Sequence, residues 1–355
     1  MTDIMRDHSS LIQSCTNKFL ASSSSNILLS QGVNDGFYGT ITDLPAQYPH
    51  QCYEIPCSEN ASVGLVLGAA TYGLTPILCF QRVEFAFLAM EQFINNSCKN
   101  TFLTSGKRTS PCLFRLVIGR GWGQGPSHSQ SFESLFTSIP DLNVYLPALP
   151  GDSDYIFNTF PTTIYPTVSI EHRWCHYSKP HPIKPTSSDP YFVLSHNQPL
   201  ITIVSSSYSL LLSLHVARIL LKYSICVDVV NYFCHSSSSR SVIYDSLSRT
   251  KRLIVVDVSD SRNSLSSLLI SDAFMDGTVL DAPPIALSSK SNYSPSSPRL
   301  VGSHYLTVLD IATSVLDSLG DIVLPDLRSS ILNHCLSVSK SQSIDQPTAE
   351  FNGPF

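Results

Sequence analysis

The chain is poor in charged residues. Only 14% of its 355 residues are Asp, Glu, Lys or Arg, compared with roughly 25% in average proteins. The net charge is −5, which argues against non-specific nucleic-acid binding because the phosphate backbone attracts basic proteins. A surface with so few charges is either covered by Ser, Thr and Asn or buried against a partner. Serine is plentiful, so the composition allows both.

Long apolar runs are missing as well. No stretch reaches the roughly eighteen consecutive apolar residues that a membrane-spanning helix needs, so we expect no contact with a membrane. The N-terminal sequence MTDIMRDHSSLIQSC lacks the basic segment and apolar core of a secretory signal. We therefore expect a cytoplasmic protein.

The cysteine pattern is not that of a disulfide framework. The ten cysteines are scattered, and several, such as Cys79, Cys112 and Cys226, lie inside apolar runs. This placement predicts reduced, buried thiols. Cys52 and Cys57 are too far apart in sequence for a C-x-x-C redox motif.

Apolar residues make up 43% of the chain, enough for sizeable cores, and the length favours two domains. Short apolar strands alternate with helical segments, which indicates α/β units on a parallel sheet. The strands expected in the first half are 52–55, 76–81, 112–118, 144–146 and 167–170, and those in the second half are 200–204, 226–230 and 252–258.

Changes in composition predict the domain boundaries. We expect a flexible polar arm over residues 1–25 and a first domain over 26–175. A linker rich in Pro, His and Ser follows at 176–195, then a second domain at 196–335 and a polar tail at 336–355. Segments rich in Pro and Ser are typical of linkers.

Glu59 lies in a turn before an apolar helix with small residues. A carboxylate buried there would have a raised pKa and would bind a nitrogen base strongly. The alternative is an acidic residue in the first turn of a helix, where the helix dipole favours it. The local sequence is compatible with both.

The stretch GRGWGQG at 119–125 has glycine at every second position. It matches neither the G-x-G-x-x-G dinucleotide motif nor a P-loop, and it predicts an extended loop close to a ligand or a partner. His128 follows it in a polar setting that suits proton transfer. A solvent-exposed loop histidine without a role is the alternative.

Two further features have structural alternatives. Phe85 lies in a segment with helical apolar spacing, where an aromatic residue is more often part of the core than a stacking platform. His172, Cys175, His176 and His181 lie close in sequence, but prolines interrupt them and their spacing matches no familiar zinc site.

Five segments together resemble one family: the beta subunit of 2-oxo acid dehydrogenase complexes, of the pyruvate dehydrogenase beta type, among the transketolase-like thiamine diphosphate enzymes. Order and spacing agree over roughly residues 30–174, and the second half resembles a transketolase C-terminal domain more loosely. The segments are SENASVGLVLGAATYGLTPI, QRVEFAFLAMEQFINN, IGRGWGQGPSHSQS, IPDLNVYLPALPGD and TVSIEHRW.

The resemblance implies an α/β fold of two domains. The first is a pyrimidine-binding, transketolase-like domain with a parallel sheet, and the second is of the transketolase C-terminal type. It also implies roles for three residues. Glu59 would hydrogen-bond the aminopyrimidine ring of thiamine diphosphate and promote ylide formation, and Phe85 would pack on that ring. His128 would transfer protons while the acyl unit passes to lipoyl.

The family pattern also implies partners. The chain has no G-D-G motif for magnesium and the diphosphate, so by resemblance these belong to an alpha subunit in an α2β2 assembly. A lipoyl-bearing acyltransferase would be a further partner. Some members hold potassium with backbone carbonyls, and the matching residues here are Cys112, Phe160, Thr163 and Tyr165.

Three functions follow from these observations. The first is the beta subunit of a thiamine diphosphate-dependent 2-oxo acid dehydrogenase or decarboxylase acting on a pyruvate-like acid. The second is half of a split transketolase-like enzyme that transfers a two-carbon unit. The third is a non-catalytic assembly subunit, against which Glu59 and His128 count.

Overall fold

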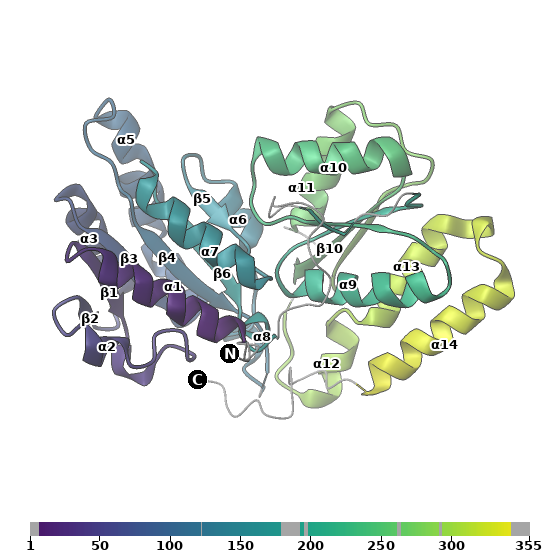
Figure 1. The fold of residues 1–355 in the computed structure, drawn as a ribbon, viewed down its shortest axis with the longest axis horizontal. Coiled ribbons are helices and arrows are strands. Elements are labelled where there is room, and N and C mark those ends of the chain that lie inside the picture. Colours follow the sequence, from purple (N-terminus) through teal and green to yellow (C-terminus); the bar gives the residue numbers. More distant parts are fainter. Residues whose placement is uncertain are drawn as a thin grey trace, which may run out of the picture. The chain divides into compact units, whose positions relative to one another are not determined.

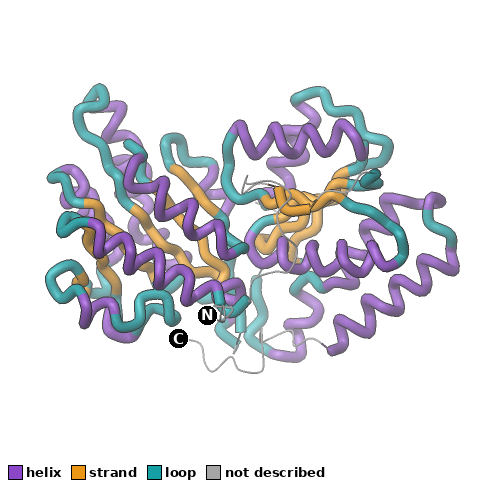
Figure 2. The backbone as a smooth tube through the Cα atoms, in the orientation of Figure 1, coloured by secondary structure: helices purple, strands orange, loops and turns teal. Residues whose placement is uncertain are grey.

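The computed structural model describes residues 7–121, 123–178, 192–194, 198–260, 264–290 and 293–341. By their internal contacts these residues divide into two compact units. The first comprises residues 7–120 and 135–178. The second comprises the rest, including 121–134, a segment that the sequence places inside the first domain. Each unit has its own sheet (Figures 1 and 2).

The first unit is built on a six-stranded parallel sheet in the order β2-β1-β3-β4-β6-β5. The strands β1, β4 and β6 are buried along their whole length, as expected for a parallel sheet covered on both faces. The strands are β1 (Asn26–Ser30), β2 (Cys52–Glu54), β3 (Thr75–Phe80), β4 (Leu113–Ile118), β5 (Asn143–Tyr145) and β6 (Thr167–His172).

Helices α1 and α7 lie side by side on one face of this sheet (Figure 1). The α-helices of this part are α1 (His8–Ser22), α2 (Leu44–Gln47), α3 (Glu59–Thr71), α4 (Val83–Ala86), α5 (Lys99–Leu103), α6 (Glu133–Thr137), α7 (Pro150–Thr159) and α8 (Arg173–His176). A π-helical segment, η3 (Gln92–Cys98), packs against α3, and short 3₁₀ turns occupy η1 (Val33–Asp35), η2 (Phe87–Ala89) and η5 (Phe160–Thr162).

The second unit has a five-stranded sheet in the order β11-β10-β8-β9-β7. Its pairs are parallel except that of β7 with β9. Helices α10 and α11 cover one face of this sheet, and α9 and α13 cover the other (Figure 1). The strands are β7 (Phe192–Leu194), β8 (Thr202–Ser205), β9 (Asp228–Asn231), β10 (Leu253–Asp260) and β11 (Ile285–Ser289).

The second unit contains six α-helices in its described residues. They are α9 (Ser207–Lys222), α10 (Ser237–Thr250), α11 (Leu265–Met275), α12 (Pro298–His304), α13 (Val308–Leu319) and α14 (Pro325–Ser341), with 3₁₀ turns at η4 (Gly125–Ser127) and η6 (Gly320–Ile322). The predicted α/β class with parallel sheets is confirmed. No helix among the described residues is long and apolar enough to cross a membrane.

The expectation of a flexible arm over residues 1–25 is wrong for residues 8–22, which form α1. Asp7 caps this helix through its side chain, and Ile12, Cys15 and Phe19 are buried. The expected tail is wrong as well for residues 336–341, because α14 extends to Ser341. Most of the expected linker lies outside the described residues, but 192–194 form strand β7.

A buried ion pair ties the first sheet together. The Arg115 guanidinium on β4 donates to both carboxylate oxygens of Glu171 on β6, at 2.8 and 2.7 Å. It also donates to Thr40 Oγ1 at 3.0 Å. Burial alone would raise the pKa of Glu171, but the Arg115 charge outweighs it and holds that pKa well below its usual range.

The same network reaches α1. His176 Nε2 on α8 lies 3.1 Å from Glu171 Oε2. His8 Nε2 at the start of α1 lies 2.9 Å from Ser153 Oγ, and its ring is edge-on to that of His176. Burial, with repulsion from His176, lowers the pKa of His8 to about 4. His8 is therefore neutral in the folded chain at pH 7.

Arg115→Met tests the ion pair. It leaves Glu171 charged and buried without its main partner, so we expect a loss of about 3–5 kcal/mol in the free energy of unfolding. The double variant Arg115→Met/Glu171→Leu removes both charges and is expected to lose less than the single variant. Urea unfolding of the three chains measures this, and a double variant less stable than the single one would contradict it.

The lowered pKa of His8 predicts that the free energy of unfolding depends on pH. The pKa of His8 lies below its unfolded value, so the unfolded chain binds more protons between about pH 6.5 and pH 4. Stability from neutral His8 is complete above about pH 6.5 and is lost as pH falls toward 4. Urea unfolding at pH 7 and pH 5 should show a smaller drop for His8→Asn than for the unchanged chain, and equal drops would exclude His8 as a source.

Candidate functional site

Glu59 is the first residue of α3, after the N-cap Ser58. Only 7% of Glu59 is exposed. The free backbone N–H groups at the start of a helix favour a negative charge there. Glu59 therefore lies in the first helical turn, as one interpretation of the sequence expects, and it is also buried, as the other expects.

The side chain of Glu59 lines a pocket of about 190 Å³. Its carboxylate contacts the thiol of Cys57, with Sγ 3.8 Å from Oε1. Among the residues that the structure describes, no nitrogen or oxygen donor hydrogen-bonds this carboxylate. A buried carboxylate that lacks such donors favours a ligand that supplies an N–H or O–H group. The other lining residues are Gln31, Ile55, Cys57, Ser62, Cys79, Phe80, Gln81 and Phe85.

Phe85 lies on α4 and lines the same pocket. Its exposed fraction is 36%, whereas its neighbours Val83 and Ala86 are fully buried. Val83 and Ala86 therefore pack in the hydrophobic core, and Phe85 does not. The Phe85 ring is one of the side chains that line the pocket.

The glycine-rich loop owes its path to its glycines. Gly119, Gly121, Gly123 and Gly125 all have positive φ angles, a region that side-chain-bearing residues avoid. A Cβ on Gly123 would lie 2.8 Å from the backbone oxygen of Ser296, and one on Gly125 would overlap the Ser296 hydroxyl. Close packing against 294–296 thus requires glycine at both positions.

His128 follows this loop directly after η4, and its side chain is partly exposed. The next residues are held by Ser294, whose hydroxyl donates to the Ser129 oxygen at 3.0 Å and whose N–H donates to Gln130 Oε1 at 3.1 Å. The structure thus brings Glu59 and Phe85 together in one pocket of the first unit, while His128 belongs to the second unit.

The side chains of Trp174 and Arg82 anchor the first two residues of the loop. Trp174 Nε1 donates to the Arg120 oxygen at 2.8 Å, and the Arg120 guanidinium lies over the Trp174 ring at 4.3 Å. Arg82 donates to the Gly119 oxygen at 3.3 Å. The chain therefore leaves β4 along a path fixed by these contacts.

Several of the residues matched to a potassium site make hydrogen bonds within the first unit. The Cys112 oxygen accepts a hydrogen bond from the Thr167 N–H at 2.9 Å. The Thr163 hydroxyl accepts from Tyr165 N–H at 3.2 Å and from Asn143 Nδ2 at 3.1 Å. Phe160 is fully buried.

The histidine-rich segment after β6 serves packing. His172 Nδ1 accepts from the Trp174 N–H at 3.1 Å, His176 pairs with Glu171, and Cys175 is buried. His181 lies outside the described residues. In the described ranges no group of three or more His, Cys, Asp or Glu side chains is arranged to hold a metal ion.

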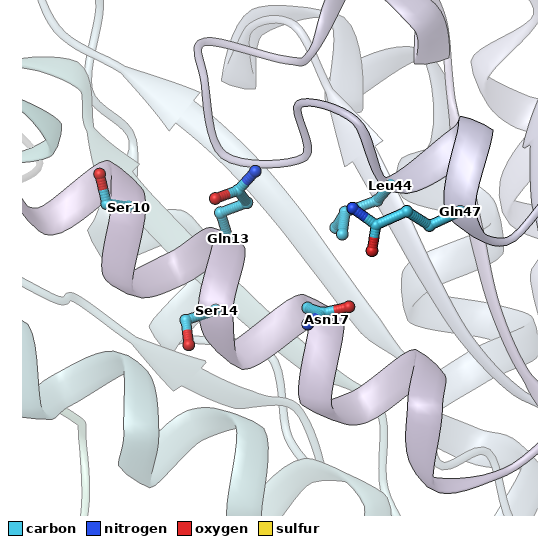
Figure 3. A pocket seen from close by; sticks show the side chains of 6 residues that line it. All are labelled: Ser10, Gln13, Ser14, Asn17, Leu44 and Gln47. Atoms are coloured by element: carbon cyan, nitrogen blue, oxygen red, sulfur yellow. The ribbon is translucent and has the colours of Figure 1, made fainter.

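A larger hollow of about 340 Å³ lies where one face of α1 meets α2. Figure 3 shows Ser10, Gln13, Ser14 and Asn17 on α1, with Leu44 and Gln47 across from them. Apart from Leu44 the lining is uncharged and polar, and it contains no group that titrates near neutral pH. The smaller Glu59 pocket, which contains a buried carboxylate, is therefore a better candidate site than this hollow.

Cys57 and Gln81 are pocket residues that the sequence did not single out. Cys57 was weighed only for a pairing with Cys52. Its position two residues before Glu59, in a turn, was the signal that could have found it. Gln81 comes directly after a buried strand and carries no such signal.

Comparison with known proteins identifies the first half of the chain. Residues 6–173 match the family model described as "Transketolase, pyrimidine binding domain". The chain is 30% identical to the pyruvate dehydrogenase E1 component subunit beta of Ascaris suum over 231 residues, 63% of this chain and 64% of that protein. The match thus spans slightly less than two thirds of that relative.

Two further proteins are similar to this chain, one in sequence and one in fold. The beta subunit of acetoin:2,6-dichlorophenolindophenol oxidoreductase from Cupriavidus necator is 26% identical, covering 65% of this chain and 69% of the relative. The solved structure titled "Split gene transketolase, inactive beta4 tetramer" superposes with a TM-score of 0.69 at 17% identity, covering 88% of this chain and 98% of that one. The latter establishes the fold alone. The resemblance seen in the sequence is thereby confirmed: residues 6–173 match the transketolase pyrimidine-binding domain, and the chain is similar to the beta subunits of pyruvate dehydrogenase E1.

Proposed function

We propose that this chain is the beta subunit of a thiamine diphosphate-dependent 2-oxo acid dehydrogenase. The assembled enzyme decarboxylates a pyruvate-like acid and passes the acyl unit to an acceptor such as lipoyl. The observation that carries the proposal is the Glu59 pocket, where a buried carboxylate without a nitrogen or oxygen donor and the ring of Phe85 line one small space. The names of the relatives give the reaction class.

The residues of the pocket fit an aminopyrimidine. Glu59 accepts a hydrogen bond from a ring nitrogen and favours the tautomer that takes up a proton. Phe85 packs on the face of the ring, and the buried strand residues Cys79 and Phe80 exclude water. Bound thiamine diphosphate supplies the carbanion and electron-sink chemistry. His128 moves a proton during acyl transfer, which its partial exposure allows.

The proposal includes partners and ions. An alpha subunit carries the magnesium and diphosphate motif that this chain lacks, and the two form an α2β2 heterotetramer. We further propose a lipoyl-bearing acyltransferase as the acceptor's carrier and a potassium ion held by carbonyls near Cys112, Phe160, Thr163 and Tyr165. For the compartment we propose the cytoplasm, with the mitochondrion as the alternative because the Ascaris suum relative is named mitochondrial.

The alternatives have less support. The structural likeness to a split-gene transketolase is at 17% identity and concerns the fold, while the relatives with higher identity are named for pyruvate and acetoin. A non-catalytic role leaves the donor-poor carboxylate of Glu59 without an explanation, because burying it costs free energy that a ligand would offset.

Calorimetry tests the proposal directly. The chain, a candidate alpha subunit and their mixture are each titrated with thiamine diphosphate and magnesium, and we expect binding by the mixture alone. Glu59→Gln in the mixture should lower kcat by about 10²-fold or more, because an amide cannot take the place of the carboxylate in proton transfer. Glu91→Gln, at an exposed glutamate of the same unit, is the matched control. Near-normal turnover of the assembled Glu59→Gln enzyme would refute the assignment.

His128→Ala separates binding from chemistry. We expect acyl transfer to lipoyl to slow by about 10²- to 10⁴-fold while cofactor affinity stays unchanged, because the histidine acts on protons of the reaction and not on the pyrimidine. Single-turnover acyl transfer and calorimetry measure the two effects, with His50→Ala, at an exposed histidine, as the control. A loss confined to cofactor affinity would contradict this role.

A further inference from the structure

One cysteine differs from all the others in its accessibility. Of the ten cysteines, every one of which is described, only Cys57 is exposed. Cys52 and Cys226 are half-buried and the remaining seven are buried. Burial raises the pKa of Cys15, Cys79 and Cys98 to about 12 and that of Cys52 and Cys335 to about 11. Those thiols do not form the reactive thiolate at neutral pH.

Cys57 is also placed where its modification would matter. Its Sγ lies 3.8 Å from Glu59 Oε1, and both residues line the pocket of about 190 Å³ together with Phe85. Glu59 is 7% exposed, and its carboxylate has no nitrogen or oxygen donor among the described residues. That carboxylate independently marks the pocket as a ligand site. The accessible sulfur is thus in contact with the group that would bind the ligand.

We propose that Cys57 is a modification site at which a low-molecular-weight disulfide, of the oxidised glutathione type, reversibly closes the Glu59 pocket. The Cys57 thiolate attacks one sulfur of the disulfide, after its proton has gone to solvent. A new S–S bond forms to Cys57, the S–S bond of the reagent breaks, and one equivalent of thiolate leaves. Cys57 is oxidised and the released half of the reagent is reduced, and an added thiol reverses the exchange.

The inference rests on the proposed function, because closing the pocket is read out as lost cofactor binding. Glutathionylation adds a tripeptide to a sulfur at the edge of a 190 Å³ space. It also brings carboxylates next to Glu59, and like charges at this distance repel. Both effects oppose entry of a pyrimidine ring, whereas a methylthio group adds little bulk and no charge.

The test begins on the free full-length chain, whose Cys57 is open to solvent. The chain is treated with oxidised glutathione, and peptide mass spectrometry locates the adduct. We expect Cys57 to be modified at least 10-fold faster than any other cysteine. Equal labelling of a second cysteine would overturn the selectivity on which the inference depends. This step does not involve the cofactor, so it stands apart from the proposed function.

The modified chain is then mixed with the alpha subunit, and assembly is followed by light scattering and thiamine diphosphate binding by calorimetry. We expect the complex to assemble, cofactor affinity to fall at least 10-fold, and dithiothreitol to restore it. Methyl methanethiosulfonate, which adds only a methylthio group, should have a smaller effect. Cys57→Ser should bind the cofactor equally well before and after treatment with oxidised glutathione, whatever its own affinity.

The outcomes are distinct. Unchanged cofactor affinity of a fully modified, assembled complex overturns the inference and leaves the proposed function intact. Loss of assembly caused by the methylthio group alone overturns it too, because the effect would then act on the subunit contact. Absence of cofactor binding by the unmodified mixture refutes the proposed function, and this inference with it.

Discussion

The pairing of Arg115 with Glu171 is the interaction on which the geometry of the first unit depends. It joins β4 to β6 at the middle of the sheet and reaches the segment after β1 through Thr40. Through His176 it extends to α8, and α1 docks beside it. Because an unpaired buried charge is costly, these elements hold one arrangement. The strand ends from which Gly119 and Trp174 emerge are fixed by it.

Two buried glutamates in this unit have opposite surroundings. Glu171 receives hydrogen bonds from a guanidinium and contacts an imidazole, so its charge is satisfied inside the protein. Glu59 is nearly as buried, yet its contact is a weakly donating thiol. The same side chain type has a structural role at Glu171, and at Glu59 it has the binding role that we propose. The number of donors, and not burial, separates the two.

The sequence predicts the positions of several strands but not their order in the sheet. The strands β3, β4 and β6 overlap segments expected from the sequence, and they lie side by side. The prediction fails for α1, where the serine-rich composition masks the helical spacing of the buried residues Ile12, Cys15, Phe19 and Leu20. The two polar members of the buried set, His8 and Thr16, weaken the apolar pattern further. The helix α14, which buries only Ile331 and Cys335, was not predicted either, because its apolar residues are sparse.

The candidate site divides in a similar way. Glu59 and Phe85 were identified through the family resemblance. Their local sequence alone is equally compatible with an acidic residue in a first helical turn and an aromatic residue in the core. That Phe85 faces a pocket depends on Val83 and Ala86 filling the core instead, which only packing decides. Cys57 became visible through one contact with Glu59. This contact depends on the conformation of the turn that precedes α3. Amino-acid composition does not predict that conformation.

The path of the chain through its two units has a consequence for how the protein is divided. Residues 121–134 belong to the second unit although residues before and after them belong to the first. Their neighbours are Ser294 and Ser296, more than a hundred and fifty positions later. Cutting the chain in the region 176–195 would therefore give two fragments, of which neither holds a whole unit. The amino-terminal half would carry the His128 loop without its support. A fragment that ends at the apparent linker therefore separates residues 121–134 from the residues they pack against.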